Sequence, residues 1–292
     1  MLIAVCLHIK RCYTDTMNDL EIVLPKIIQI AREAGAKILE YWGKTREELH
    51  VTLKADRTAL SAADMAAHEI IAEGLFALTP DIPLLSEEGA HLPYEERKLW
   101  PRYWLSDPLD GTRGFLEGSR EFTVNIALIE GNCSVLGVVY VPVEDICYYA
   151  TGKSAAYRVI KDQQPEKIHS RALNWQDYTV LLGNSTQVNP LLNRLKRQPA
   201  ATLRYVNSSY KLGIMASGEA DFYPRLGRTS EWDTAAAQCV LEAAGGAVVD
   251  FNQQPLQYNA KSSLINPPFL AAGDKTQIAK IISLIEKLRN KI

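Results

Sequence analysis

Apolar residues recur at helical spacing along the early part of the chain. Between Asp19 and Gly43 they fall three or four positions apart, which predicts an amphipathic helix that ends at the glycine. Residues 61–80 show a second helical pattern, and Ser61 is of a residue type that favours the N-cap position. The pattern therefore predicts two successive helices at the start of the fold.

Shorter apolar runs, typical of strands, follow these helices. The runs IPLLSEEG and RYWLSD each stop at acidic residues. Residues 122–150 and 152–159 have the pattern of a ladder of short strands, with a tight hairpin turn at residues 130–132. Helices followed by hairpin-connected strands indicate that this half combines helices with an antiparallel sheet.

The second half of the chain has a different order, in which strands and helices alternate. After a polar stretch at 161–177, we expect strands at 178–184, 201–207, 220–225 and 247–251 and helices at 189–198, 208–218 and 232–246. Alternation of this kind needs crossover connections and indicates a layered α/β domain. We therefore predict a disordered extension at residues 1–18, an N-terminal α+β domain at 19–158 and a C-terminal α/β domain at 159–292.

Composition and charge narrow the class of protein. With 292 residues, of which 47% are hydrophobic, the chain can bury a large core. Its 32 Lys and Arg against 34 Asp and Glu give a net charge of -2, which offers no general field for holding nucleic acid. The five cysteines lack the paired spacing of zinc sites or disulfide frameworks, which favours a reducing cytoplasm. The apolar run within residues 1–16 is too short to span a bilayer, so we expect no integral membrane segment.

The stretch YWLSDPLDGT carries the clearest candidate chemistry. Asp107 and Asp110 follow a buried run, and a turn through the intervening proline would bring both carboxylates together with the carbonyl of Leu109. Oxygen ligands of this kind suit a hard cation such as Mg2+. Gly111 and Thr112 begin the next element, where free N–H groups of a helix start favour phosphate. An alternative is that DPLDG is an ordinary turn.

Other acidic residues also end apolar runs or begin helices, and each has a structural alternative. Glu87 and Glu88 fit either a metal site or a solvated loop. Asp233 fits either a metal ligand or a favourable charge at a helix N-terminus. Asp64 fits either a functional group or a capping box with Ser61.

The five histidines are scattered, and none falls within the acidic segments. This distribution disfavours a zinc enzyme or a histidine-based hydrolase. His68 fits either a partner of Asp64, one helical turn earlier, or a packing role.

Taken in order, five segments resemble a known superfamily. KADRTALSAAD, LLSEEG, YWLSDPLDGT, GEAD and WDTAAA are similar to motifs of the lithium-sensitive, magnesium-dependent phosphatases that include inositol monophosphatase. The agreement extends from about Asp19 to Asn266. In more detail, LTPDIPLLSEEG, REFTVNIALIEG, LGVVYVPV and FYPRLGRTSEWDTAAA resemble the 3'(2'),5'-bisphosphate nucleotidases of the CysQ type. The resemblance implies a layered αβαβα sandwich, in which the N-terminal domain binds metal and the C-terminal domain completes the active site.

The resemblance also implies roles for single residues. The metal ligands would be Glu87, Asp107, Asp110, Asp233 and the backbone oxygen of Leu109, holding two or three Mg2+ ions. Asp64 and Thr112 would activate water, with Glu87 as a third catalytic residue. The substrate contacts would be Gly111, Thr112, Ser208, Ser209, Lys211 and Arg225. Inhibition by Li+ or Na+ would follow if either ion replaced one Mg2+.

The implied reaction is hydrolysis of the 3'-phosphate of adenosine 3',5'-bisphosphate to AMP and phosphate, in sulfate assimilation. Its sulfated precursor is a second candidate substrate. An inositol or sugar monophosphatase is an alternative within the superfamily, and a noncatalytic sensor of the bisphosphate nucleotide is an alternative of another class. The resemblance further implies a cytoplasmic monomer or homodimer, with peripheral attachment to the inner membrane left open. One departure is Arg113-Gly114, where relatives usually carry Lys-Glu.

Overall fold

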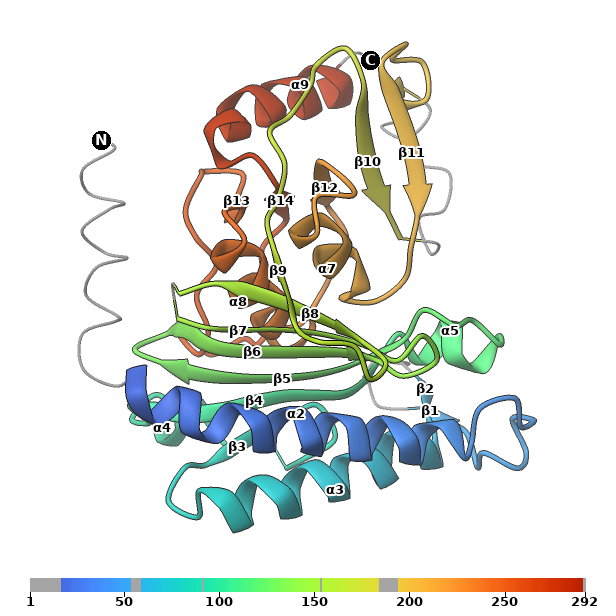
Figure 1. Cartoon of the computed structure of the whole chain (residues 1–292), viewed down its shortest axis with the longest axis vertical. Helices are drawn as coiled ribbons and strands as arrows, with labels where there is room; N and C mark the ends of the chain where they lie inside the picture. Colours follow the sequence, from blue (N-terminus) through green and yellow to red (C-terminus); the bar gives the residue numbers. More distant parts are fainter. Residues whose placement is uncertain (1–16, 54–58, 91, 153, 184–193, 291–292) are drawn as a thin grey trace.

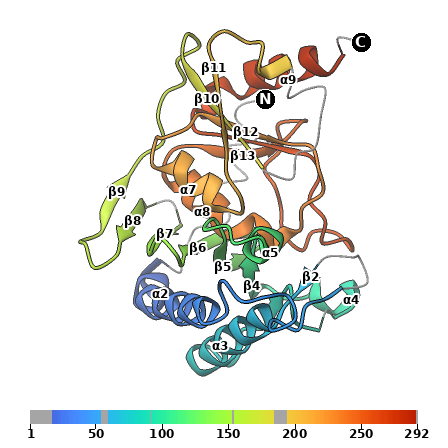
Figure 2. The same cartoon turned by 90° about the vertical axis from the view of Figure 1, so that its right-hand side faces the viewer.

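Two β-sheets and three sets of helices form five stacked layers (Figures 1 and 2). The computed structural model describes residues 17–53, 59–90, 92–152, 154–183 and 194–290. No helix in these ranges is both long and apolar enough to cross a membrane. The order helix, sheet, helix, sheet, helix confirms the predicted αβαβα sandwich.

The first sheet has seven strands and carries helices on one face. Helices α2 (Met17–Leu39) and α3 (Ala62–Leu78) cover that face. In spatial order the strands are β3 (Leu84–Ser86), β4 (Arg102–Asp110), β5 (Thr123–Glu130), β6 (Cys133–Val141), β7 (Ile146–Thr151), β8 (Ala156–Ile160) and β9 (Glu166–Ile168). The β3–β4 pair is parallel, and every other neighbouring pair is antiparallel. The short elements in this half are β1 (Thr52–Leu53), β2 (Ala59–Leu60), α4 (Tyr94–Arg97) and α5 (Thr112–Leu116).

The second sheet has five strands and mixes parallel with antiparallel pairs. In spatial order they are β11 (Ala201–Tyr205), β10 (Tyr178–Leu182), β12 (Phe222–Arg225), β14 (Phe269–Ala272) and β13 (Ala247–Asp250). Helices α7 (Tyr210–Ala216) and α8 (Ala235–Ala243) lie between the two sheets, and α9 (Ile278–Asn290) covers the outer face (Figure 1). Two 3-10 turns, η1 (Glu231–Asp233) and η2 (Lys275–Gln277), precede α8 and α9.

Each junction between layers has its own hydrophobic cluster. Successive side chains of a strand point to opposite faces, so Ile126 and Leu128 of β5 pack toward α2 and α3. Ala127 and Ile129 of the same strand pack toward α7 and α8. A third cluster joins the second sheet to α9 through residues such as Ile281. Because the central strands are buried on both faces, they read as continuous apolar runs in the sequence.

Several local predictions are confirmed. Helix α3 begins after Ser61 with a complete capping box, in which Asp64 is the second member. The β5–β6 hairpin turns through Gly131 and Asn132, whose φ angles are +55° and +68°. Two positive φ angles give the turn that matches the twist of a hairpin, and glycine and asparagine tolerate them best.

Other features differ from the expectation or extend it. The first sheet continues to Ile168, so the predicted domain boundary at 158/159 falls within β8. Polar edge strands such as β9 carry no apolar run that would reveal them.

Strand β14 and helix α9 were not predicted. Of the predicted extension at 1–18, residues 1–16 lie outside the described residues, and α2 already starts at Met17. Half of the predicted helix 189–198, residues 189–193, also lies outside the described residues.

Helix α8 approaches the first sheet closely at Gly137. A Cβ atom at this position of β6 would lie 2.2 Å from the backbone oxygen of Ala236 and 2.9 Å from the Cβ of Cys239. The obstacle on the helix includes backbone, which cannot rotate away as a flexible side chain could. Glycine is therefore required here by the contact between two layers.

We expect Gly137→Ala to lower the free energy of unfolding by about 3 kcal/mol, at the upper end of the usual cost of overpacking. The reason is that the added methyl group must push α8 away from β6. Urea denaturation of the purified protein measures the change. The control is Gly227→Ala, because an added Cβ there meets nothing closer than 3.7 Å. Equal stability of the two variants would contradict the proposed close packing.

Candidate active site

Three carboxylates from distant parts of the sequence meet at one end of the first sheet. Glu87 follows β3, Asp107 lies near the end of β4, and Asp233 ends η1. They offer ligand atoms within 4.8 Å of one another, and Asp107 is 2% exposed. The parallel pairing of β3 with β4 places the first two together, because the N–H of Glu87 donates to the oxygen of Ser106 at 3.0 Å.

A bulge in β4 separates the two aspartates of the DPLD segment. Asp107 pairs with Asn125 of β5, whereas Asp110 pairs with Thr123, so β4 carries one extra residue between the two pairs. The N–H of Leu109 donates to Oδ1 of Asp107 at 3.1 Å. We predicted a turn after the strand, and the structure instead continues the strand through a bulge.

Burial and mutual repulsion dominate the electrostatics of this cluster. Burial raises the pKa of Asp107 well above its usual value, and the charge of Glu87 adds to the effect. Burial and the charge of Asp110 likewise raise the pKa of Asp233, although the N–H of Ser230 opposes this by donating to its Oδ2 at 2.9 Å. A divalent cation held by oxygen atoms would offset these like charges, so the donor set fits Mg2+.

Asp64 and Thr112 form a hydrogen-bonded pair beside the cluster. The hydroxyl of Thr112 lies 3.1 Å from Oδ1 of Asp64 and 3.1 Å from the oxygen of Leu109, two acceptors for its single hydrogen. The other oxygen of Asp64 accepts the N–H and the hydroxyl of Ser61, at 2.8 Å and 2.6 Å. The capping box, which the sequence offered as the alternative to a functional role for Asp64, therefore occurs together with the hydrogen bond to Thr112.

Gly111 makes the turn between β4 and α5. Its φ is +95°, a conformation that side-chain-bearing residues rarely adopt. An added Cβ would also lie 3.4 Å from the Cβ of Ser208. This turn brings Thr112 to the start of α5 and places both residues beside the segment from the second half.

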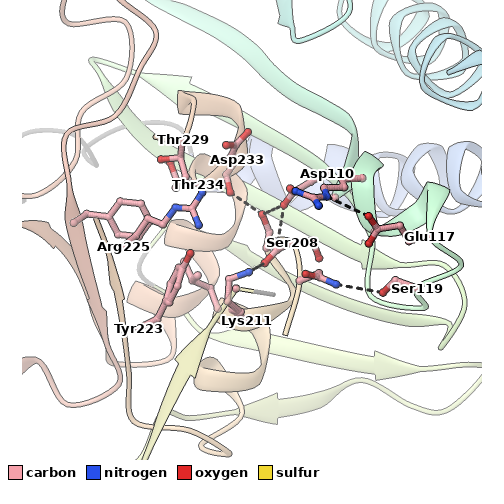
Figure 3. A pocket seen from close by; sticks show the side chains of 18 of the residues that line it. Asp110, Glu117, Ser119, Ser208, Lys211, Tyr223, Arg225, Thr229, Asp233 and Thr234 are labelled. Carbon is pink, nitrogen blue, oxygen red and sulfur yellow. Dashed lines mark hydrogen bonds and ion pairs between the residues drawn. The ribbon is translucent and has the colours of Figure 1, made fainter. Parts of the chain in front are cut away.

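A pocket of about 470 Å³ opens next to the carboxylates (Figure 3). Both halves of the chain line it, with Asp110, Gly111, Arg113 and Gly114 from the first and Ser208, Ser209, Lys211, Tyr223, Arg225 and Asp233 from the second. Figure 3 shows Arg225 and Tyr223 on one side of the pocket and Asp110 and Glu117 on the other. Thr112 is not among the lining residues, although its neighbours are.

The two predicted cations of the pocket have different environments. Lys211 is 6% exposed, and its Nζ donates to the backbone oxygens of Val206 and Ser208 at 3.1 Å and 2.6 Å. Burial lowers the pKa of Lys211 to about 8. Arg225 donates from Nη2 to the oxygen of Arg228 at 2.9 Å, and its buried Nε makes no hydrogen bond with the described residues.

The predicted serines also differ. Ser208 is at a turn with φ of +53° and accepts the N–H of Tyr210 at 3.3 Å. Ser209 is 3% exposed, and its hydroxyl lies 2.7 Å from Oδ2 of Asp110 and 2.7 Å from the backbone oxygen of Asp233.

The sequence interpretation missed Asn125, a residue near the carboxylates. Asn125 is 1% exposed, and its Nδ2 lies 2.9 Å from the hydroxyl of Ser209. A polar residue within the apolar strand FTVNIALIE was the signal that could have identified it. His68 contacts Ser86, with its Nδ1 2.9 Å from the hydroxyl, and so supports the residue before Glu87. The hydrogen bond of His68 is thus to a residue of β3, whereas the sequence suggested Asp64 as its partner or a packing role.

Comparison with known proteins gives consistent matches over nearly the whole chain. A 3'(2'),5'-bisphosphate nucleotidase CysQ from Haemophilus influenzae is 36% identical over 263 residues, covering 89% of this chain and 96% of that protein. The protein of the same name from Escherichia coli K12 is 39% identical over 247 residues, covering 85% and 98%. The crystal structure of CysQ from Bacteroides thetaiotaomicron, described as a bacterial member of the inositol monophosphatase family, superposes with a TM-score of 0.73 at 33% identity, covering 86% and 96%.

The family assignment rests on the extent of the match as well as on identity. The model of the inositol monophosphatase family matches residues 19–289, which include both sheets and all the candidate site residues. The chain therefore belongs to the inositol monophosphatase family.

Proposed function

We propose that this protein is a Mg2+-dependent 3'(2'),5'-bisphosphate nucleotidase that converts adenosine 3',5'-bisphosphate to AMP and phosphate. The observation that carries the proposal is the group of Glu87, Asp107 and Asp233, whose ligand atoms lie within 4.8 Å of one another beside a pocket that also contains cations. The curated relatives, at 36% and 39% identity, bear the name of this activity. The sulfated precursor of the substrate would fit the same chemistry, because it carries the same 3'-phosphate.

We propose that metal is held by Glu87, Asp107, Asp110, Asp233 and the backbone oxygen of Leu109. All five are oxygen donors, as hard divalent cations require. Bound Mg2+ would supply positive charge that neutralises the phosphate ester, makes water more acidic and stabilises the departing oxygen. Two or three ions would suit five ligands of this kind, and competition by Li+ or Na+ would follow at a weakly held position.

Water activation is assigned to Thr112 and Asp64. Asp64 Oδ1 accepts the hydrogen of the Thr112 hydroxyl at 3.1 Å, so a lone pair of that hydroxyl can accept a hydrogen from water. As the water oxygen bonds to phosphorus, the bond from phosphorus to the 3'-oxygen would break. One proton of the water would pass through the hydroxyl to Asp64, and the 3'-oxygen would take a proton from solvent as AMP leaves. Ser61 keeps the other oxygen of Asp64 in place. No covalent phosphoenzyme is needed.

The 5'-phosphate of the nucleotide is assigned mainly to Arg225. Its Nε is buried and makes no hydrogen bond with the described residues, so a phosphate oxygen would satisfy it. Lys211 already donates to two backbone oxygens, and its charge would act on the phosphate from a buried position. An inositol monophosphate has no second phosphate group that could bind to these cations.

The first test is phosphate release from adenosine 3',5'-bisphosphate, AMP and inositol 1-phosphate, each with Mg2+ and with EDTA. We expect release only from the bisphosphate and only with Mg2+, because both the metal site and the cations of the pocket are then used. Release mainly from inositol 1-phosphate would retain the metal site and exclude the nucleotide assignment.

The matched variants for that assay are Asp107→Asn and Asp81→Asn. Loss of a buried ligand charge should abolish measurable turnover in the first, whereas Asp81 is exposed and its variant should behave like the parent protein. Binding of the bisphosphate without any release by the parent protein would favour the noncatalytic sensor.

Replacement of Thr112 separates water activation from binding. We expect Thr112→Val to lower kcat by about 100-fold to 10,000-fold, the usual contribution of general acid–base catalysis, with little change in KM. Thr112→Ser keeps the hydroxyl and should retain most of the activity. Steady-state kinetics on the bisphosphate measures both values. A valine variant as active as the serine variant would contradict the role of the hydroxyl.

Replacement of Arg225 tests recognition of the 5'-phosphate. We expect Arg225→Met to raise KM for adenosine 3',5'-bisphosphate by about 10-fold to 100-fold, the value of a hydrogen bond to a charged group. KM for adenosine 3'-monophosphate, which lacks the 5'-phosphate, should not change. Arg228→Met is the control, because the hydrogen bond from Arg225 is to the backbone oxygen of Arg228, which the substitution retains. Equal increases for both substrates would show that the arginine does not recognise the 5'-phosphate.

A further inference from the structure

Ser209 lies between two of the proposed metal ligands. Asp110 comes from the first half of the chain and Asp233 from the second. The hydroxyl of Ser209 lies 2.7 Å from Oδ2 of Asp110 and 2.7 Å from the backbone oxygen of Asp233. The N–H of Ser209 also donates to Oδ2 of Asp110, at 2.6 Å. One residue thus contacts both ligands, through its side chain and its backbone.

Asn125, on β5 of the first sheet, is a further hydrogen-bond partner of Ser209. Its Nδ2 lies 2.9 Å from the hydroxyl of Ser209 and 3.4 Å from Oδ2 of Asp110. Because a serine hydroxyl has one hydrogen and two lone pairs, it can accept from Asn125 and still donate to one of the two ligands. Both side chains are buried, with exposed fractions of 3% for Ser209 and 1% for Asn125.

These donors fix the orientation of the Asp110 carboxylate. The hydrogen-bond donors near it among the described residues all lie at Oδ2: the N–H and hydroxyl of Ser209, Asn125 and, at 3.5 Å, Thr123. An oxygen with so many donors is a poor further ligand, since its lone pairs are already used. Oδ1 is then the oxygen that can face a cation.

We propose that Ser209, with Asn125, is a positioning residue for the metal site. Asp110 and Asp233 come from different halves of the chain, and Ser209 fixes the distance between them. It also keeps Oδ1 of Asp110 directed to the cation. The resemblance implied a substrate contact for Ser209, and its burial together with its three protein partners favours the new role. This inference rests on the proposed metal site at Glu87, Asp107, Asp110 and Asp233.

The test is titration of Mg2+ alone into the full chain by isothermal titration calorimetry, without substrate. Loss of a side chain that orients a metal ligand typically costs 10-fold to 100-fold in affinity, so we expect Ser209→Ala to bind Mg2+ about 10-fold to 100-fold more weakly. Asn125→Ala should act in the same direction. If the two act as a unit, the double variant should lose less than the product of the single losses.

Ser208→Ala is the matched control, because the Ser208 hydroxyl accepts the N–H of Tyr210 and not a bond from a proposed metal ligand, so Mg2+ affinity should be unchanged. Kinetics gives a second readout: saturating Mg2+ should restore kcat of Ser209→Ala with an unchanged KM for the bisphosphate. A raised KM that excess Mg2+ does not correct would overturn the proposal in favour of a substrate contact.

Two further outcomes distinguish this inference from the proposed function. Mg2+ affinity of Ser209→Ala equal to that of the parent protein would overturn the inference alone. A parent protein that binds no Mg2+ would overturn the metal site, and with it the role of Ser209. Circular dichroism of each variant checks that the fold is retained.

Discussion

The crowding of carboxylates around the buried Asp107 is the constraint on which the arrangement of this protein depends. Like charges within 4.8 Å repel strongly where water is excluded, so the backbone must hold each group in place. Asp64, Asp110 and Asp233 show one common solution, since in each the Oδ2 oxygen accepts hydrogen bonds from a nearby serine. In two of them that serine is the N-cap of a capping box. A motif that normally stabilises a helix start here orients a charged group, which leaves the other oxygen to the site.

The two halves must also be held together, because neither contains the whole site. Helix α8 lies directly on β6 at Gly137, and η1, which ends at Asp233, is continuous with that helix. A buried polar network that includes Arg97 of α4 forms a second connection between the two halves. The amide of Asn259 donates to the backbone oxygen of Arg97 at 2.6 Å, and the N–H of Asn259 donates to the carboxylate of Glu231, also at 2.6 Å. Glu231 is fully buried two residues before Asp233, so this network fixes the position of η1 relative to the first half.

The sequence predicted correctly those elements whose conformation depends on residues that are close together in the chain. The capping box at Ser61 and the hairpin at Gly131 depend on residues close in sequence, and both are confirmed. Contacts between distant segments were not accessible in this way. The bulge in β4 depends on pairing with β5, and the role of Asn125 depends on a serine 84 positions later. The first sheet extends to Ile168 because backbone pairing, not apolar side chains, recruits its last strand. The convergence of the acidic residues was expected from family resemblance. The hydrogen bonds that orient them could not be predicted, because most of them join residues that are far apart in the sequence.

The cations of the pocket illustrate why residue type alone did not determine a role. Lys211 and Arg225 are equally plausible phosphate ligands in the sequence, yet only Lys211 gives two hydrogen bonds to backbone oxygens of the turn before α7. Burial lowers its pKa to about 8, and the charge of Asp110 acts in the opposite direction and favours the protonated form. The two hydrogen bonds of the Lys211 side chain stabilise the turn that carries Ser209. Arg225 keeps a buried Nε that lacks a hydrogen-bond partner among the described residues, and an unpaired buried donor costs free energy. Lys211 therefore supports the turn beside the site. Under the proposed function, Arg225 has an unpaired donor that can bind the substrate.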